Sequence, residues 1–207
     1  MSKSNEFQFS DAKQDRSKQT LDDLLESAYA IVESADPEAF NSRSLAKKSG
    51  YALGTLHKRL SSIENVFLWA IQQGQKKHLE TLSCITNEFN RDLPIQHLAE
   101  QMVDATFIAI KKVNPKVIRF FETKFLQKNG LPPNFFGYID ALIEPYMEAA
   151  LRDRTNTFRR MNHDELRLTL RAILMILERP FVDLDPIAGT SAHRQIAIEA
   201  VVRLLGR

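Results

Sequence analysis

Apolar residues recur along most of the chain at three- and four-residue intervals, the spacing that gathers side chains on one face of an α-helix. The first such stripe comprises Leu21, Leu24, Leu25, Ala28, Ile31 and Val32. Thr20 and Asp23 have the spacing of a capping pair at its start, and Asp36-Pro37 predicts its end. No stretch sustains the alternation of a β-strand, so the sequence predicts an all-α protein of about nine helices.

Two short helices are predicted next, separated by a glycine. Asn41 is placed as the N-cap of the first helix, and Gly50 as the left-handed residue that ends it. The second is predicted over Ala52 to Leu60, and Ser61 with Glu64 predicts a capping box that opens a longer helix. Two short helices joined at a glycine and braced by longer ones are typical of a helix-turn-helix.

The remaining chain is also predicted to be helical. Pro94 and Pro115 occupy the positions of first-turn prolines. Phe135 to Ala150 is apolar on nearly every side, which is typical of a central helix, and Pro145 predicts a kink in it. Two final helices are expected over about residues 162–178 and 191–205, with a loop over residues 180–189 between them.

These elements predict three regions. We expect a flexible arm over residues 1–19, a helix-turn-helix domain over residues 20–66 and a larger helical bundle over residues 67–207.

The composition is that of a packed globular protein, with 43% hydrophobic and 26% charged residues. The polar amino terminus has no apolar core of signal-peptide length, and no apolar run is long enough to cross a bilayer. The single cysteine, Cys84, cannot form an intramolecular disulfide, and we expect it to be a buried apolar residue. A cytoplasmic protein without membrane association is expected.

Residues for catalysis or metal binding do not form a recognisable pattern. The five histidines are scattered, none is spaced as a zinc-binding pair, and Cys84 has no cysteine partner. No phosphate-binding loop or nucleophile elbow is present. The sequence therefore predicts no metal, no cofactor and no enzymatic activity.

Charge is unevenly distributed, although the formal net charge is only +2. Residues 41–63 contain no acidic residue and five cations, namely Arg43, Lys47, Lys48, Lys58 and Arg59. Such a window favours binding to nucleic-acid phosphates, but a solvated basic helical face has the same charge, so both interpretations stay open. The candidate DNA contacts are Ser42, Arg43, Lys47, Ala52, Leu53, Thr55, His57, Lys58 and Arg59.

From Leu24 to Ile71 the chain resembles the amino-terminal domain of the TetR family of bacterial transcriptional repressors. The matching segments are LLESAYAIVES, NSRSLAKKSG and GTLHKRL followed by ENVFLWAI. The resemblance implies that Arg43 reaches a base edge or a phosphate and that Thr55 lies at the DNA surface. His57 stands where the family usually has a tyrosine, and Ile63 where many members have a phosphate-contacting lysine.

Aromatic and methionine side chains are frequent in the carboxyl-terminal half, and they predict a pocket for a small apolar or aromatic effector. Core packing is the alternative role for most of them. The candidate ligand contacts are Met102, Thr106, Phe107, Phe121, Phe125, Tyr138 and Met147.

Two apolar stripes close the chain, and a monomer could bury them against its own bundle. The resemblance implies instead that they form the interface of a homodimer. The candidate interface residues are Leu166, Leu170, Ile173, Leu174, Leu177, Ile196, Ala200, Val201 and Leu204.

Together these features predict a homodimeric, TetR-like repressor that binds a palindromic DNA operator and is released by its ligand. The alternative is an adaptor or ligand carrier of the same helical fold that has lost specific DNA binding. Leu53, His57 and Ile63, which depart from the family's pattern, favour that alternative.

Overall fold

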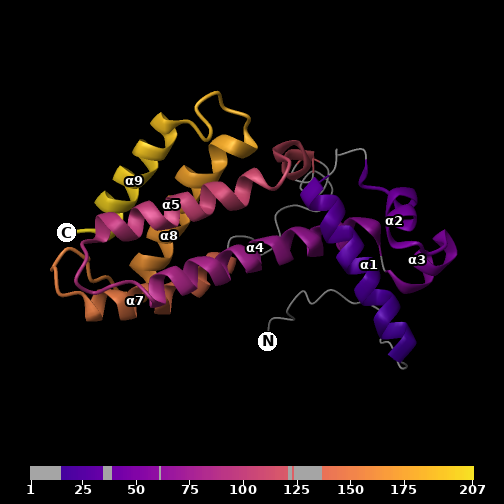
Figure 1. Ribbon diagram of the computed structural model, residues 1–207, viewed down its shortest axis with the longest axis horizontal. Helices are drawn as coiled ribbons and strands as arrows, with labels where there is room; N and C mark the ends of the chain where they lie inside the picture. Colours follow the sequence, from indigo (N-terminus) through magenta and orange to yellow (C-terminus); the bar gives the residue numbers. More distant parts are fainter. Residues whose placement is uncertain (1–14, 35–38, 61, 121–122, 124–136) are drawn as a thin grey trace.

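The computed structural model in Figure 1 describes residues 15–34, 39–60, 62–120, 123 and 137–207. Their helices are α1 (Asp15–Ser34), α2 (Ser42–Ser49), α3 (Leu53–Arg59), α4 (Ile63–Asn87), α5 (Ile95–Lys111), the 3₁₀ helix η2 (Gly137–Leu142), α7 (Ile143–Arg152), α8 (His163–Val182) and α9 (Ser191–Leu205). Residues 115–120 are helical as well. The only β-structure in these ranges is an isolated bridge between Phe158 and Gly206. The all-α prediction is confirmed.

Helices α1, α2, α3 and the first half of α4 surround a small apolar core. Its fully buried side chains include Leu24, Leu45, Leu56, Val66 and Phe67. Val117, from the helical residues that follow α5, completes this core. The short helices α2 and α3 therefore depend on α1 and α4 for burial of their apolar faces, because helices of this length are marginal alone.

A second, larger core lies among α5, η2, α7, α8, α9 and the second half of α4. Leu98, Ile143, Leu166 and Leu170 are among its most deeply buried side chains. In Figure 1, α5, α8 and α9 lie at the end of the molecule opposite α2 and α3.

Helix α4 belongs to both cores and has 25 residues, which corresponds to a length of about 37 Å. Val66 and Phe67 lie in the core around α1, whereas Leu79 and Leu82 lie in the larger one. A tilt of α4 in the larger core would therefore move the elements that pack on its other end.

Two predicted helix starts differ from the structure. Helix α1 already includes residues 15–19, which the sequence had assigned to the arm, and Thr20 lies inside the helix rather than at its cap. Polar residues can extend a helix without an apolar face, and here the Gln19 side-chain amide donates to the Asp23 carboxylate one turn later, at 2.8 Å. The N-cap of α4 is Ser62 instead of Ser61, with its hydroxyl accepting from the Asn65 N–H.

The region around Pro145 also differs from its prediction. The described part consists of η2 followed by α7, so Pro145 lies in the first turn of a new helix rather than at a kink inside a long one. A first-turn N–H has no intrahelical partner, and a proline therefore fits there without loss of a hydrogen bond. Phe135 and Phe136 lie outside the described residues.

Helix α8 continues to Val182, beyond the predicted end at Glu178, and so includes Pro180. Phe181 and Val182 are both buried, and their packing offsets the hydrogen bond that Pro180 cannot donate. The expectation for Cys84 was wrong, because its side chain is exposed on α4. Within the described ranges, no helix is both long and apolar enough to span a bilayer.

Candidate DNA-binding surface

Local capping determines where α2 ends and α3 begins. The Asn41 side-chain oxygen accepts from the Ser44 N–H at 2.9 Å, which satisfies one free donor of the first turn of α2. Gly50 follows α2 with φ 76°, and its N–H donates to the Ala46 carbonyl. After Ala52, which has extended backbone, α3 begins at Leu53. The predicted helix-turn-helix is confirmed.

Two leucines hold this unit against the rest of its domain. Leu45 of α2 and Leu56 of α3 are both fully buried in the smaller core. Because each short helix turns one leucine inward, its opposite face is directed to solvent.

A hydrogen bond attaches the turn between α2 and α3 to α1. The Tyr51 hydroxyl donates to Asp23 Oδ2 at 2.6 Å. This bond is the main cause that lowers the pKa of the Asp23 carboxyl, and it raises the pKa of the Tyr51 phenol. Sequence reasoning missed this pair, since the two residues are 28 positions apart and no local pattern relates them.

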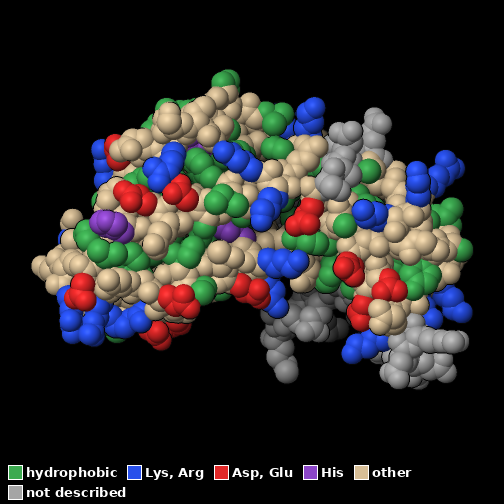
Figure 2. Space-filling model, in the orientation of Figure 1, with side chains coloured by type: hydrophobic (Ala, Val, Ile, Leu, Met, Phe, Trp, Pro, Cys, Tyr) green, Lys and Arg blue, Asp and Glu red, His purple; other side chains and the backbone are tan. Residues whose placement is uncertain are grey.

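The predicted DNA contacts lie together on the solvent face of this unit. Arg43, Lys47, Ala52, Leu53, His57 and Lys58 are exposed, and Ser42, Thr55 and Arg59 are half-buried. Figure 2 shows Lys and Arg side chains around the end of the molecule that α2 and α3 form.

The cations of this surface are available for a partner. None of Arg43, Lys47, Lys48, Lys58 and Arg59 forms an ion pair with another residue of the described ranges. By contrast, arginines of the carboxyl-terminal bundle are paired with carboxylates, as Arg171 is with Asp140 and Arg194 with Asp104.

Apolar groups lie beside these cations at the start of α3. Leu53 is 41% exposed, and Ala52 next to it is also exposed. Small and branched apolar side chains at such a position can contact the methyl group of thymine. Ile63, by contrast, packs partly buried against the smaller core.

The candidate ligand contacts that the structure describes do not lie around one common space, because Phe107 lines a cleft beside α9, apart from Met102 and Thr106. Met102 and Thr106 line a cavity of about 20 Å³ between α5 and α8, which is room for about one water molecule. Phe107 is buried, and Tyr138 and Met147 are half-buried at the edge of the larger core. Phe121 and Phe125 lie outside the described residues. In the part that the structure describes, no group of three or more His, Cys, Asp and Glu side chains is placed to hold a metal ion.

Two titratable side chains of the bundle with shifted pKa values were not predicted from the sequence. Glu178 of α8 accepts from the Tyr138 hydroxyl at 3.5 Å, and burial raises the pKa of its carboxyl to about 7. His78 of α4 has both ring nitrogens buried and without a hydrogen-bond partner, and burial lowers its pKa to about 4. Both groups are therefore held closer to their neutral forms than they would be in water.

Most side chains predicted for the dimer interface lie inside the core of a single chain. Val201 of α9 and all the predicted members on α8 are buried in this core. The α8 members are Leu166, Leu170, Ile173, Leu174 and Leu177. Of the other α9 members, Ile196 is 50% exposed, and Ala200 and Leu204 are half-buried. Periodicity shows that one face of a helix is buried but cannot show whether its partner is the same chain. The large apolar side chains of α8 that remain exposed are Leu168 and Met175.

At the level of sequence, no family model and no curated protein matches this chain. Solved structures do match it over almost the whole length. A TetR-family transcription regulator from Marinobacter aquaeolei VT8 has a TM-score of 0.55 at 14% identity, with 92% of this chain and 97% of that chain covered. A TetR-family transcriptional regulator from Haemophilus influenzae RD has a TM-score of 0.51 at 16% identity, with 94% and 100% covered. This chain has the TetR-regulator fold.

The TetR-like fold extends the resemblance beyond the segment that suggested it. That segment ended at Ile71, whereas the structural match includes the carboxyl-terminal bundle. At these identities the likeness concerns the fold, and function has to be argued from the residues of this chain.

Proposed function

We propose that this protein is a DNA-binding transcription regulator that uses α2 and α3 to contact duplex DNA in the cytoplasm. The observation that carries the proposal is the cluster of five cations without ion-pair partners in the described ranges, on the solvent face of a helix-turn-helix whose first helix is capped by Asn41. An exposed cation without a partner can contact a phosphate without first breaking an ion pair, and counterion release from the DNA favours the contact.

Two kinds of contact are available on this surface. The start of α3, with Ala52, Leu53 and Thr55, would enter a major groove, where apolar and hydroxyl groups can contact base edges. Arg43 in the first turn of α2, and Lys58 near the end of α3, flank that position and suit backbone phosphates. His57 is exposed beside Lys58 and can donate to a phosphate, although its reach is shorter than that of a tyrosine.

We propose further that the protein acts as a homodimer. Leu168 and Met175 of α8 and Ile196 of α9 are exposed apolar side chains on helices that pack against each other. A second copy would cover them in a two-fold, self-complementary interface. Two α3 helices related by that symmetry can engage half-sites about 34–36 Å apart, which is one turn of DNA, so a palindromic operator is expected.

Repression and its release by a small effector are the regulatory part of the proposal. The effector would be apolar or aromatic and would bind in the bundle near Met102 and Thr106. That space has a volume of only about 20 Å³, so the effector has to separate α5 from α8 as it enters. Because α4 belongs to both cores, such a rearrangement would change the position of α3 relative to its dimer mate. A coupling of about 1–3 kcal/mol is typical for this kind of regulation.

The experiment is a selection of duplexes from a random or genomic pool with the purified protein, at low and at moderate salt. We expect a recurrent palindrome that survives the higher salt. Arg43→Ala and Thr55→Ala should each weaken its binding, and Arg43→Ala should also lower the slope of log K against log salt by about 0.9, the value for one phosphate contact. Arg91→Ala, which removes an exposed arginine from the loop after α4, is the matched control and should bind like the unaltered protein.

The adaptor or ligand-carrier function makes a different prediction for the same experiment. A folded dimer that enriches no duplex at either salt would favour it and contradict the DNA-binding proposal. Equal binding by Arg43→Ala, Thr55→Ala and the unaltered protein would remove the assignment of α2 and α3 as the contact surface.

A further inference from the structure

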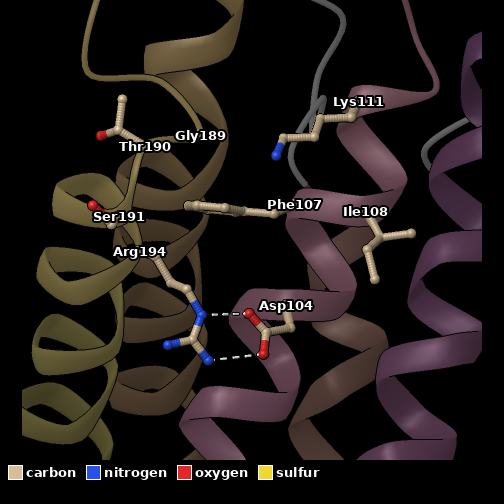
Figure 3. A pocket seen from close by; sticks show the side chains of 8 residues that line it. All are labelled: Asp104, Phe107, Ile108, Lys111, Gly189, Thr190, Ser191 and Arg194. Atoms are coloured by element: carbon tan, nitrogen blue, oxygen red, sulfur yellow. Dashed lines mark hydrogen bonds and ion pairs between the residues drawn. The ribbon is translucent and has the colours of Figure 1, made fainter.

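A cleft of about 340 Å³ opens between α5 and the start of α9, outside the core of the bundle. Figure 3 shows Phe107, Ile108 and Lys111 on the α5 side, and Thr190, Ser191 and Arg194 on the α9 side. This volume is at the lower limit for sites that hold small molecules, and it is far larger than the space beside Met102.

The cleft has an apolar side on α5. Phe107 is buried in a cluster of rings, with its centroid 5.1 Å from that of Phe181 and 4.6 Å from that of His193. Ile108 lies beside it and is 61% exposed. A packed ring next to an exposed aliphatic side chain offers an apolar contact that a ligand can cover.

The opposite wall is held by a buried histidine. The Gly189 N–H donates to Nδ1 of His193 at 3.1 Å, so Nε2 of the neutral ring donates to the Ile176 carbonyl at 2.9 Å. His193 is 2% exposed, and its backbone N–H donates to the Thr190 hydroxyl, which caps α9. These three bonds fix the loop that enters α9.

Gly189 brings this wall close to Lys111. Its φ is 71°, and a Cβ added there would lie 3.0 Å from the Phe181 ring and 3.1 Å from Cε of Lys111. A residue with a side chain would therefore be strained and would crowd both neighbours. The absence of a side chain at Gly189 is what leaves room for the lysine stem along the cleft.

Two cations line the cleft, and within the described residues only Arg194 has an ion-pair partner. Arg194 donates from Nε and Nη2 to the two carboxylate oxygens of Asp104, at 2.6 and 2.8 Å. This pairing lowers the pKa of Asp104, so the two opposite charges compensate each other at neutral pH. Lys111 has no ion-pair partner within the described ranges, and Figure 3 shows its ammonium group directed toward the space between α5 and α9.

Hydrogen-bond donors lie on the wall opposite Lys111. Ser191 opens α9, so its backbone N–H has no acceptor inside the helix, and its hydroxyl is exposed. The cleft therefore combines one excess positive charge, donors and an apolar side within a small volume.

We propose that this cleft binds a small organic carboxylate with an apolar body. The carboxylate would lie between Lys111 and the first turn of α9, and the apolar body would cover Phe107 and Ile108. Inorganic phosphate would leave the apolar side exposed, and a neutral molecule would leave the lysine without a counter-charge. The binding is a property of the protein without DNA, so it stands or falls independently of the proposed regulatory function.

Isothermal titration of the full-length protein with benzoate, hexanoate, benzamide and inorganic phosphate tests this assignment. We expect saturable binding of at least one carboxylate, at least tenfold weaker binding of the amide and of phosphate, and loss of affinity as ionic strength rises. Lys111→Met keeps most of the aliphatic stem and should weaken carboxylate binding by about tenfold or more. Lys112→Met removes the neighbouring exposed lysine, which does not line the cleft, and should bind like the unaltered protein.

The apolar part of the site has its own variant. Ile108→Ser changes an exposed side chain, so the fold should persist, and it should weaken hexanoate binding without changing the preference for carboxylate over amide. Circular dichroism and thermal unfolding of every variant confirm folding. No saturable carboxylate binding, equal binding of benzoate and phosphate, or equal losses in Lys111→Met and Lys112→Met would each overturn the proposal.

Discussion

The Tyr51 hydroxyl donates to the Asp23 carboxylate at 2.6 Å and so joins the turn of the helix-turn-helix to α1. Leu45 and Leu56 hold α2 and α3 through apolar contacts, which permit small rotations, whereas this hydrogen bond has a defined direction. The orientation of α3 relative to α1 therefore depends on a polar contact near the candidate DNA surface.

Tyr51→Phe removes the hydroxyl and should loosen that turn. We expect a slightly lower melting temperature, faster amide hydrogen exchange in α2 and α3, and weaker DNA binding. Because the pKa of Asp23 is lowered in the folded protein, the bond stabilises above about pH 3.8, and this stabilisation is lost as the pH falls through the lowered pKa. The variant should therefore show a smaller loss of stability on acidification. Tyr29→Phe is the control for loss of a phenol from α1, and an equal effect of both variants on DNA binding would contradict the role of Tyr51.

Gly50→Ala should destabilise the protein through backbone conformation. A Cβ at Gly50 would meet no atom within 4 Å, so the cost arises from φ 76° and should be about 1–2 kcal/mol. Gly54→Ala is the matched control, since Gly54 lies inside α3 with equally open surroundings. It should stabilise the protein by about 0.5–1 kcal/mol. Urea unfolding measures both, and a change of the same sign in the two variants would refute this explanation.

Leu168→Glu and Ile196→Lys should shift the protein toward monomer. Both side chains are exposed in one chain and would be buried in the proposed dimer, where an unpaired charge is costly. Analytical ultracentrifugation over a range of concentrations measures the dissociation constant. Leu151→Glu changes an equally exposed leucine on α7 and should leave the association unaltered. If the unaltered protein is monomeric at all concentrations, the dimer proposal fails.

Glu178→Gln should change how stability depends on pH. The folded-state pKa of about 7 lies above the ordinary value of 4.5, so the native state holds more protons than the unfolded state between these values. Stability from this group is complete below about pH 4.5 and is lost as the pH rises to about 7. At pH 8 the glutamine variant should be more stable by about 1–3 kcal/mol, whereas at pH 4 the difference should be small. Urea unfolding at the two pH values measures this difference in stability, and an equal difference at both would show that the pKa of Glu178 is not raised.

His78→Leu should change the stability of the protein at acidic pH. The pKa of His78 is lowered from 6.5 to about 4, so the native state holds fewer protons between these values and loses stability as the pH falls through this window. The leucine variant should lose less stability between pH 7 and pH 4. At pH 7 it should be at least as stable as the unaltered protein, because no ring nitrogen is left buried without a partner. His97→Leu, at an exposed position on α5, should keep the original pH dependence.

The helix-turn-helix could be predicted from sequence because its determinants are local. The Asn41 side chain caps α2 by accepting from the N–H three residues later. Gly50 ends α2 because it adopts the left-handed conformation, and its N–H donates to a carbonyl one turn earlier. The apolar positions Leu45 and Leu56 follow from periodicity, and the exposed cations follow because charged side chains are costly to bury. Neither inference needs knowledge of the rest of the chain.

Tertiary structure decided which surfaces meet. Leu166 and Leu170 belong to a stripe whose partner is the chain's own core, whereas Leu168, two residues away from each of them, is exposed. Tyr51 with Asp23, and Lys111 with Gly189, come from distant parts of the sequence. The sequence by itself determined the helical class, the caps of α2 and the charge of α2 and α3, since these depend on neighbours within one or two turns. The partner of each apolar face, the cleft beside α9 and the partial burial of Glu178 depend on long-range packing, which no local pattern specifies.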